Sequence, residues 1–166
     1  GGHSGLEIDK GRGNSIKILN RTLIALEKLE ARLSTIEGGN KSNAIPREAE
    51  ALLTIPAKNV KKAKTIVDRC NSTIKAELAT VEPDLSITLK EVQLKKAKVI
   101  KKAQQKMLTQ TIAGLPHGVT KMSADIPGLV ETSTNVAIIR TEKSNIVLTT
   151  SQRSSVASEI DEILET

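Results

Sequence analysis

The sequence predicts an α+β protein, built as an antiparallel sheet with helices on one face. Segments with helical apolar periodicity alternate along the chain with short runs in which apolar and polar residues alternate. The 166 residues suit one domain or two small subdomains that share a core. No uninterrupted apolar run is long enough to cross a membrane, so no membrane partner is expected.

Four segments have the spacing of helices. Their apolar residues recur three, four or seven positions apart, which gives each helix one buried stripe. Asn14 or Ser15 can cap the first of them. Cys70 falls on the stripe of the second, which favours a small core residue over a nucleophile. The predicted helices are 14–33, 57–79, 95–113 and a last one from 156 to the C-terminus.

Five shorter runs alternate between apolar and polar residues, as strands do. Pro56 ends the second run, because proline cannot donate to a strand ladder. The last two flank Glu142-Lys143-Ser144 and predict a hairpin, whereas residues 114–128 read as a loop rich in Gly and Pro. The predicted strands are 5–9, 48–55, 85–89, 135–141 and 145–151.

The order of these elements resembles that of the ferredoxin-like fold. We therefore expect a first ferredoxin-like subdomain at residues 1–93 and a second, partial one at residues 94–166. The second unit ends on a helix without a following strand, which is typical of a piece excised from a longer protein.

Composition limits the classes of partner. The net charge is +6, but the lysines lie within helical patterns and the chain has no aromatic residue to stack on a base, so we expect no nucleic acid. The single cysteine cannot form an internal disulfide and no secretion signal is recognisable, which favours the cytoplasm. Without Phe, Trp or Tyr, the core must consist of Leu, Ile and Val.

No motif points to chemistry by this chain alone. A two-metal site needs several converging ligands, and the only histidines, His3 and His117, are far apart in sequence. Gly11-Arg12-Gly13 is not followed by the rest of a phosphate-binding loop. The chain is therefore expected to be inactive and to bind no metal by itself. Residues alone leave open a stand-alone ferredoxin-like module that binds a protein or RNA.

Four segments change this interpretation, because they resemble the lid domain of the carboxypeptidase-G-like zinc exopeptidases. The third is similar to a stretch specific to the aminoacyl-histidine dipeptidases, and all four occur in family order. They are Gly-Gly-His-Ser-Gly at 1–5 with Gly-Arg-Gly-Asn at 11–14; Gly-Gly-Asn-Lys-Ser-Asn-Ala-Ile-Pro-Arg-Glu-Ala at 38–49; Gly-Leu-Pro-His-Gly-Val at 114–119 with Gly-Leu-Val-Glu-Thr-Ser-Thr-Asn at 128–135; and Ser-Gln-Arg-Ser-Ser at 151–155.

The resemblance implies a two-domain parent enzyme. Its catalytic domain, in the same polypeptide, would hold two zinc ions and a glutamate base, and the lid would close over a dipeptide such as Xaa-His. The family's zinc motifs, His-x-Asp and Glu-Glu, have no match here, so no cofactor is expected in this chain. A homodimer is compatible with the family.

The resemblance also assigns roles to residues. His3 would hydrogen-bond the developing oxyanion, with a solvent-exposed terminal histidine as the alternative. Arg153 would grip the substrate carboxylate with two parallel hydrogen bonds, and is otherwise a surface arginine at a strand end. Asn43 either donates to the same carboxylate or simply forms a turn.

Three further polar residues, Thr132, Ser133 and Asn135, cluster before the predicted hairpin. They either hydrogen-bond substrate or reflect the ordinary polarity of a loop. His117 lies in a Pro-Gly segment and is interpreted as structural or exposed.

Overall fold

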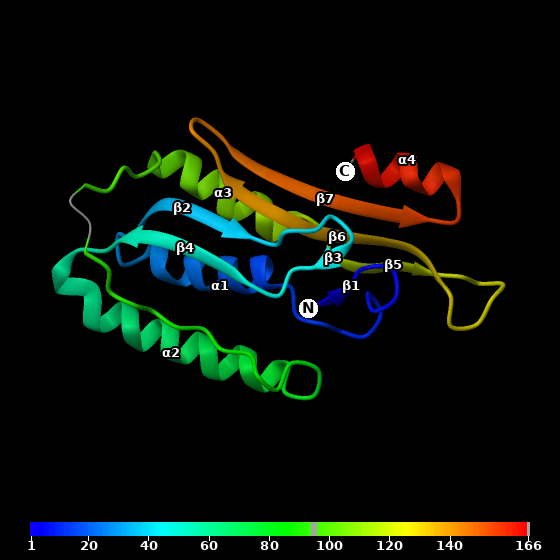
Figure 1. The fold of residues 1–166 in the computed structure, drawn as a ribbon, viewed down its shortest axis with the longest axis horizontal. Coiled ribbons are helices and arrows are strands. Elements are labelled where there is room, and N and C mark those ends of the chain that lie inside the picture. The colour runs from blue at the N-terminus through cyan, green and yellow to red at the C-terminus, as the bar shows by residue number, and fades with distance from the viewer. Residues whose placement is uncertain (94–95, 166) are drawn as a thin grey trace.

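The computed structural model describes residues 1–93 and 96–165 and has the predicted α+β architecture (Figure 1). The helices are α1 (Ser15–Glu27), α2 (Val60–Glu77, preceded by the 3-10 turn Ala57–Asn59), α3 (Lys102–Gly114) and α4 (Ala157–Glu165). The strands are β1 (Gly2–His3), β2 (Arg32–Gly38), β3 (Ala44–Ile45), β4 (Ala49–Thr54), β5 (Gly118–Met122), β6 (Val130–Thr141) and β7 (Ile146–Ser154).

Strand β6 is the centre of an antiparallel five-stranded sheet. Strand β7 runs along one of its edges, from the pair Thr132–Ser154 to the pair Thr141–Ile146. On the other edge β5 pairs with the start of β6 and β2 with its end, and β4 adds to β2. A separate two-stranded ribbon joins β1 to β3. The sheet takes strands from both halves of the chain, and the division into two ferredoxin-like subdomains stays a prediction.

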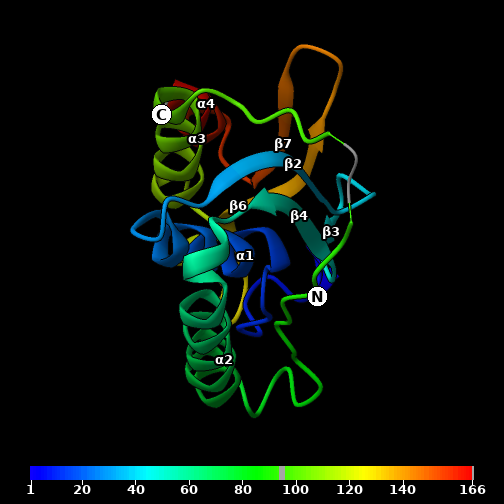
Figure 2. The same cartoon turned by 90° about the vertical axis from the view of Figure 1, so that its left-hand side faces the viewer.

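Helices α1 and α3 cover one face of the sheet, and α2 packs beside α1 (Figures 1 and 2). The core between them is made only of aliphatic side chains, as the composition requires. A second aliphatic cluster lies between α1 and α2. The buried residues of the main core are Ile16, Leu23, Leu33, Ile36, Ile112, Val136 and Ile139.

Local chemistry sets the ends of α1. Asn14 caps its start, because its Oδ1 accepts hydrogen bonds from the backbone nitrogens of Ile16 (3.0 Å) and Lys17 (3.2 Å). At the other end Glu30 has a φ of 60°, a left-handed conformation that a helix cannot continue through. The chain then enters β2. The prediction of one helix over 14–33 was therefore right at its start and wrong at its end.

Two predicted strands are absent. Residues 5–9 form turns, in which the backbone nitrogens of Leu6 and Glu7 both donate to the carbonyl of His3. Residues 85–89 are irregular and lie along α2, where the backbone nitrogen of Ile87 donates to Oδ1 of Asn71 (2.7 Å). Their apolar alternation reflects packing of Ile87 and Leu89 on the second cluster rather than strand pairing.

Other segments were predicted more closely. Strand β4, helix α2, the turn of the β6–β7 hairpin and helix α4 lie where the sequence predicted them, but β6 begins at Val130, five residues before the predicted strand 135–141. Within the predicted helix 95–113, Lys95 lies outside the described residues and α3 begins only at Lys102. Before it, the backbone nitrogen of Ile100 donates to the carbonyl of Leu33 (2.9 Å). The predicted loop 114–128 contains β5, an exposed and bulged strand without strong alternation.

Within the described part of the chain, no helix combines the length and apolarity needed to span a bilayer.

Candidate functional site

The ribbon of β1 and β3 presents His3, which pairs with Ala44 and has an exposed side chain. The backbone nitrogen of His3 donates to Oε2 of Glu7 (2.8 Å). Nδ1 of its ring lies 3.1 Å from the backbone nitrogen of Gly5 and accepts that hydrogen bond. In the neutral ring the hydrogen is then on Nε2, which is left to act as a donor.

Gly5 brings His3 and Arg153 together. A Cβ built on Gly5 would lie 2.5 Å from Nη1 of Arg153 and 3.2 Å from Cε1 of His3. The guanidinium and the imidazole therefore flank Gly5, and a larger residue there would displace the guanidinium of Arg153 from this place. Strand β7 supplies Arg153, which pairs with Ser133 of β6, so the two ends of the chain meet at this point.

Two β6 residues lie on the same face of the sheet as Arg153. Successive side chains of a strand point to opposite faces, so Ser133, Asn135 and Arg153 share one face. Asn135 is 1% exposed, and its Nδ2 donates to the carbonyl of Ala44 (2.8 Å), which fastens β3 to β6. Asn43, which immediately precedes Ala44, has an exposed side chain, and its backbone carbonyl accepts a hydrogen bond from the backbone nitrogen of Ser4. Thus the structure gathers His3, Asn43, Ser133, Asn135 and Arg153 around the β1–β3 ribbon.

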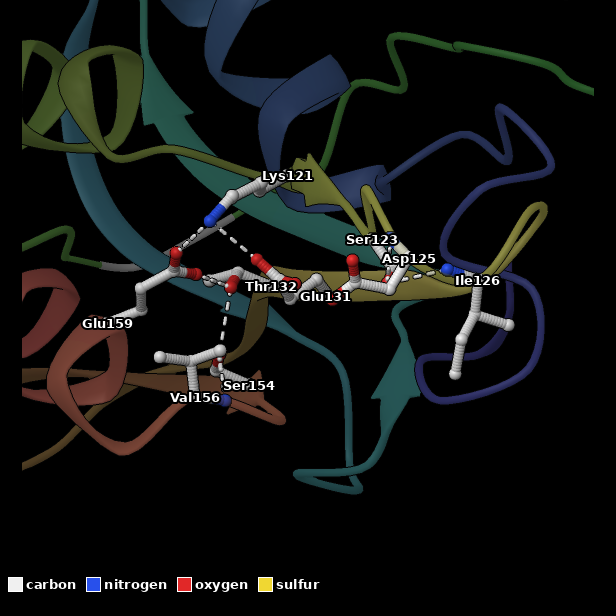
Figure 3. A network of polar contacts seen from close by, with 9 residues as sticks. All are labelled: Lys121, Ser123, Asp125, Ile126, Glu131, Thr132, Ser154, Val156 and Glu159. Atoms are coloured by element: carbon white, nitrogen blue, oxygen red, sulfur yellow. Dashed lines mark hydrogen bonds and ion pairs between the residues drawn. The ribbon is translucent and has the colours of Figure 1, made fainter.

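Thr132 lies apart from this group, on the face that the helices cover. Its hydroxyl lies 2.8 Å from Oγ of Ser154 and also contacts the carboxylate of Glu159 in α4 (Figure 3). The side chain is 2% exposed. Of the residues predicted to contact substrate, it is the one that the structure does not bring towards His3 and Arg153.

His117 is half-buried on the helix-covered face. Its Nδ1 lies 3.3 Å from Nδ2 of Asn14, which also donates to the carbonyl of Val136 (2.8 Å). Burial, and secondarily the nearby charge of Lys17, lowers the pKa of His117 to about 4. This histidine is therefore neutral at neutral pH and part of the structure.

Among residues 1–93 and 96–165, no group of three or more His, Cys, Asp or Glu side chains is placed to hold a metal ion. Cys70 is half-buried against the cluster between α1 and α2.

Comparisons with known proteins define the class. The model of the peptidase dimerisation domain matches residues 1–82. The chain is 38% identical over 147 residues to the cytosol non-specific dipeptidase of Escherichia coli K12, a match that covers 88% of this chain and 30% of that protein. We conclude that residues 1–82 belong to the peptidase dimerisation domain family.

A solved structure shows which members of the family this chain resembles in fold. The crystal structure of aminoacylhistidine dipeptidase from Vibrio alginolyticus matches with a TM-score of 0.94 and 34% identity, over 99% of this chain and 34% of that one. The resemblance to the lid of these dipeptidases, predicted from the sequence, is confirmed. The chain spans about a third of the length of both relatives.

The sequence did not single out Gly5 or Glu159. Gly5 belongs to the Gly-Gly-His-Ser-Gly segment, and its position beside His3 was the available signal. Glu159 is one of several acidic residues on a short amphipathic helix, and nothing in the sequence distinguishes it.

Proposed function

We propose that this chain is the lid of a zinc-dependent, cytoplasmic dipeptidase that hydrolyses Xaa-His and related dipeptides. In this function the lid supplies an oxyanion donor and a carboxylate clamp, and it is not catalytic alone. The convergence of His3 and Arg153 on Gly5 carries the proposal, because it unites an imidazole donor and a guanidinium at one exposed place.

His3 is suited to stabilise negative charge. Its Nδ1 is occupied by the Gly5 backbone nitrogen, so Nε2 carries the hydrogen and can donate to an oxygen outside the lid. When a peptide carbonyl is attacked, its oxygen becomes an oxyanion, and a donor already in place stabilises that oxyanion more than the ground state. A His3→Ala variant of the full-length enzyme should therefore lose kcat rather than raise KM.

Arg153 is suited to hold the other end of a dipeptide. Its exposed guanidinium can offer two parallel N–H donors to the free carboxylate. The exposed side chain of Asn43 would add a donor. The hydroxyl of Ser133 shares the face of Arg153 but is only 5% exposed, so it would contribute only where the substrate reaches the sheet. This arrangement favours substrates with a free C-terminus.

The remaining parts belong to the rest of the parent protein. The catalytic domain of the same polypeptide would hold two zinc ions, which when bound would polarise the scissile carbonyl. The names of the relatives support the dipeptide substrate and the cytoplasmic location, and the family name supports a homodimer. Neither nucleic acid nor membrane is part of the proposal.

The test uses the full-length parent enzyme with a dipeptide and its C-terminal amide. Arg153→Ala and Arg153→Lys should lower kcat/KM for the free acid by roughly ten- to several-hundred-fold, because lysine cannot form the bidentate fork. The amide has no carboxylate, so wild type and variants should process it almost equally slowly. Arg140→Ala, at the other end of the β6–β7 hairpin, is the matched control. An equal loss on both substrates would refute the clamp.

A further inference from the structure

A polar network ties α4 to the end of the sheet, on the face opposite His3. Nζ of Lys121 in β5 lies 2.6 Å from Oε1 of Glu131 and also contacts the carboxylate of Glu159 in α4 (Figure 3). Glu159 in turn accepts from the hydroxyl of Thr132 in β6, and that hydroxyl contacts Ser154 in β7. The carboxylate of Glu159 therefore joins α4 to β5 and β6, and Ser154 connects β7 to the network through the hydroxyl of Thr132.

The network contacts the sheet at the strand pair next to the one that contains Arg153, the candidate carboxylate clamp. Thr132 pairs with Ser154, and the next pair along the strands is Ser133 with Arg153. Because side chains alternate between faces, the first pair points to α4 and the second to the β1–β3 ribbon. A shift of Ser154 would therefore be transmitted directly to Arg153 on the other face.

Apolar packing of α4 is only partial, since Ile160 and Ile163 are half-buried. None of the residues Ala157–Glu165 is buried. The turn before the helix is also held by polar bonds, from the backbone nitrogen of Ser155 to the carbonyl of Glu131 (3.0 Å) and from that of Val156 to Oγ of Ser154 (3.0 Å). Polar contacts centred on Glu159 and Ser154 thus fix the end of β7.

The electrostatics keep Glu159 charged. The pKa of the Glu159 carboxyl is lowered mainly by its hydrogen bond with Lys121 and then by that with Thr132. The pKa of Lys121 is raised by the hydrogen bonds that Lys121 makes with Glu131 and Glu159. The carboxylate is only 19% exposed and that of Glu131 only 12%, so both are partly shielded from water. Shielded, shared contacts of this kind hold geometry better than an isolated surface ion pair.

We propose that Glu159 is a positioning residue for Arg153. By bridging Lys121 and Thr132 behind the strand pair, it fixes the end of β7 so that the guanidinium of Arg153 lies against Gly5, beside His3. The inference rests on the proposed role of Arg153 in binding the substrate carboxylate. Glu159 itself does not touch the substrate.

The experiment compares free-acid and amide dipeptides in the full-length enzyme. Glu159→Gln, which keeps the shape and removes the charge, should raise KM for the free acid about three- to tenfold, with little change for the amide. Thr132→Val removes the hydroxyl by a separate route and should have the same signature, whereas Thr132→Ser should restore wild-type behaviour. Asp161→Asn, at an exposed acid of the same helix, is the matched control.

A double-mutant cycle gives the deciding result. If Glu159 acts through Arg153, Glu159→Gln should add nothing in an Arg153→Ala background. Suppose that Arg153→Ala does discriminate the free acid from the amide. The inference about Glu159 is then overturned, while the proposed function stands, by any of three results: an equal loss on both substrates, an unchanged KM in both folded variants, or an additive effect in the cycle. If Arg153→Ala does not discriminate, the proposed function fails and this inference fails with it.

Discussion

The helix-covered core and the region around His3 and Arg153 are built in different ways. In the core, fully buried Ile16, Ile36 and Ile112 come from three elements and contact one another through apolar surface alone. Around His3 the contacts are hydrogen bonds and close backbone approaches, such as Asn135 to Ala44 and Gly5 to Arg153. Aliphatic side chains therefore fill the main core of this fold without aromatics, whereas polar contacts shape the candidate site.

The core and the candidate site should also differ in how they tolerate substitutions. A packed core loses stability when volume is removed, because neighbours refill a cavity only in part. A site made of directed polar contacts loses function when geometry shifts slightly, even if the fold survives. Substitutions in the two regions should therefore separate stability from activity.

The largest effect is expected in the core. Ile16→Ala should lower the free energy of unfolding of this chain by about 2–5 kcal/mol, because Ile16 is 0% exposed between α1 and the sheet. Ile24→Ala is the matched control on the same helix, where the side chain is 42% exposed, and should cost less than about 1 kcal/mol. Urea denaturation measures both. Equal losses would contradict the assignment of the core face of α1.

A smaller effect should appear as acid sensitivity of the folded chain, caused by the half-buried His117. The pKa of His117 is about 4 in the folded chain and near 6.5 when unfolded, so the unfolded chain binds more protons between these values. Stability is therefore fully present above pH 6.5 and falls as the pH drops towards 4. Allowing for partial exposure, the loss should be about 1–3 kcal/mol.

His117→Gln should flatten that pH dependence, because glutamine does not titrate in this range. Denaturation midpoints at pH 7, 5.5 and 4.5 for both proteins provide the measurement. A variant that remains as acid-sensitive as the wild type over this window would show that the buried imidazole is not the cause.

The smallest effect on folding is expected at Gly5. Gly5→Ala places a Cβ against the flexible end of Arg153, which can move aside, so the midpoint of unfolding should barely change. The full-length enzyme should nevertheless lose about tenfold in kcat/KM on free-acid dipeptides, because the guanidinium is displaced. Gly114→Ala is the control, since a Cβ there meets nothing within 4 Å. A fully active Gly5→Ala enzyme would contradict the packing of Arg153 against Gly5.

Periodicity predicted the elements that obey simple repeats and missed those that break them. The predicted helix 14–33 takes in only the first two residues of β2, because Leu33 falls seven positions after Leu26. The rest of β2 shows no clean alternation, because a bulge between Leu33 and Thr35 puts Leu33 and Ile36, three residues apart, on the same face. That spacing is the one expected of a helix. The short strands β1 and β3, of two residues each, are too brief to show any period.

Prediction of the site depended on resemblance rather than on pattern. His3 and Arg153 were named because of the segments around them, and the structure places both beside Gly5. The predicted strand began only at residue 135, so Thr132 and Ser133, adjacent in sequence, were placed before it and were not expected to face opposite sides of a sheet. Their separation became visible only through the register of β6 and β7.

The approach of Arg153 to Gly5 has a consequence for the order of folding. These residues lie near opposite ends of the chain, so their contact closes a loop that includes almost every other element. Loop-closure entropy makes such distant contacts late events in folding, after local hairpins and helices have formed. During synthesis, α1, β2 and β4 can associate while β7 is still unmade. Substrate recognition by this lid should therefore appear in a single late step, when the last strand docks.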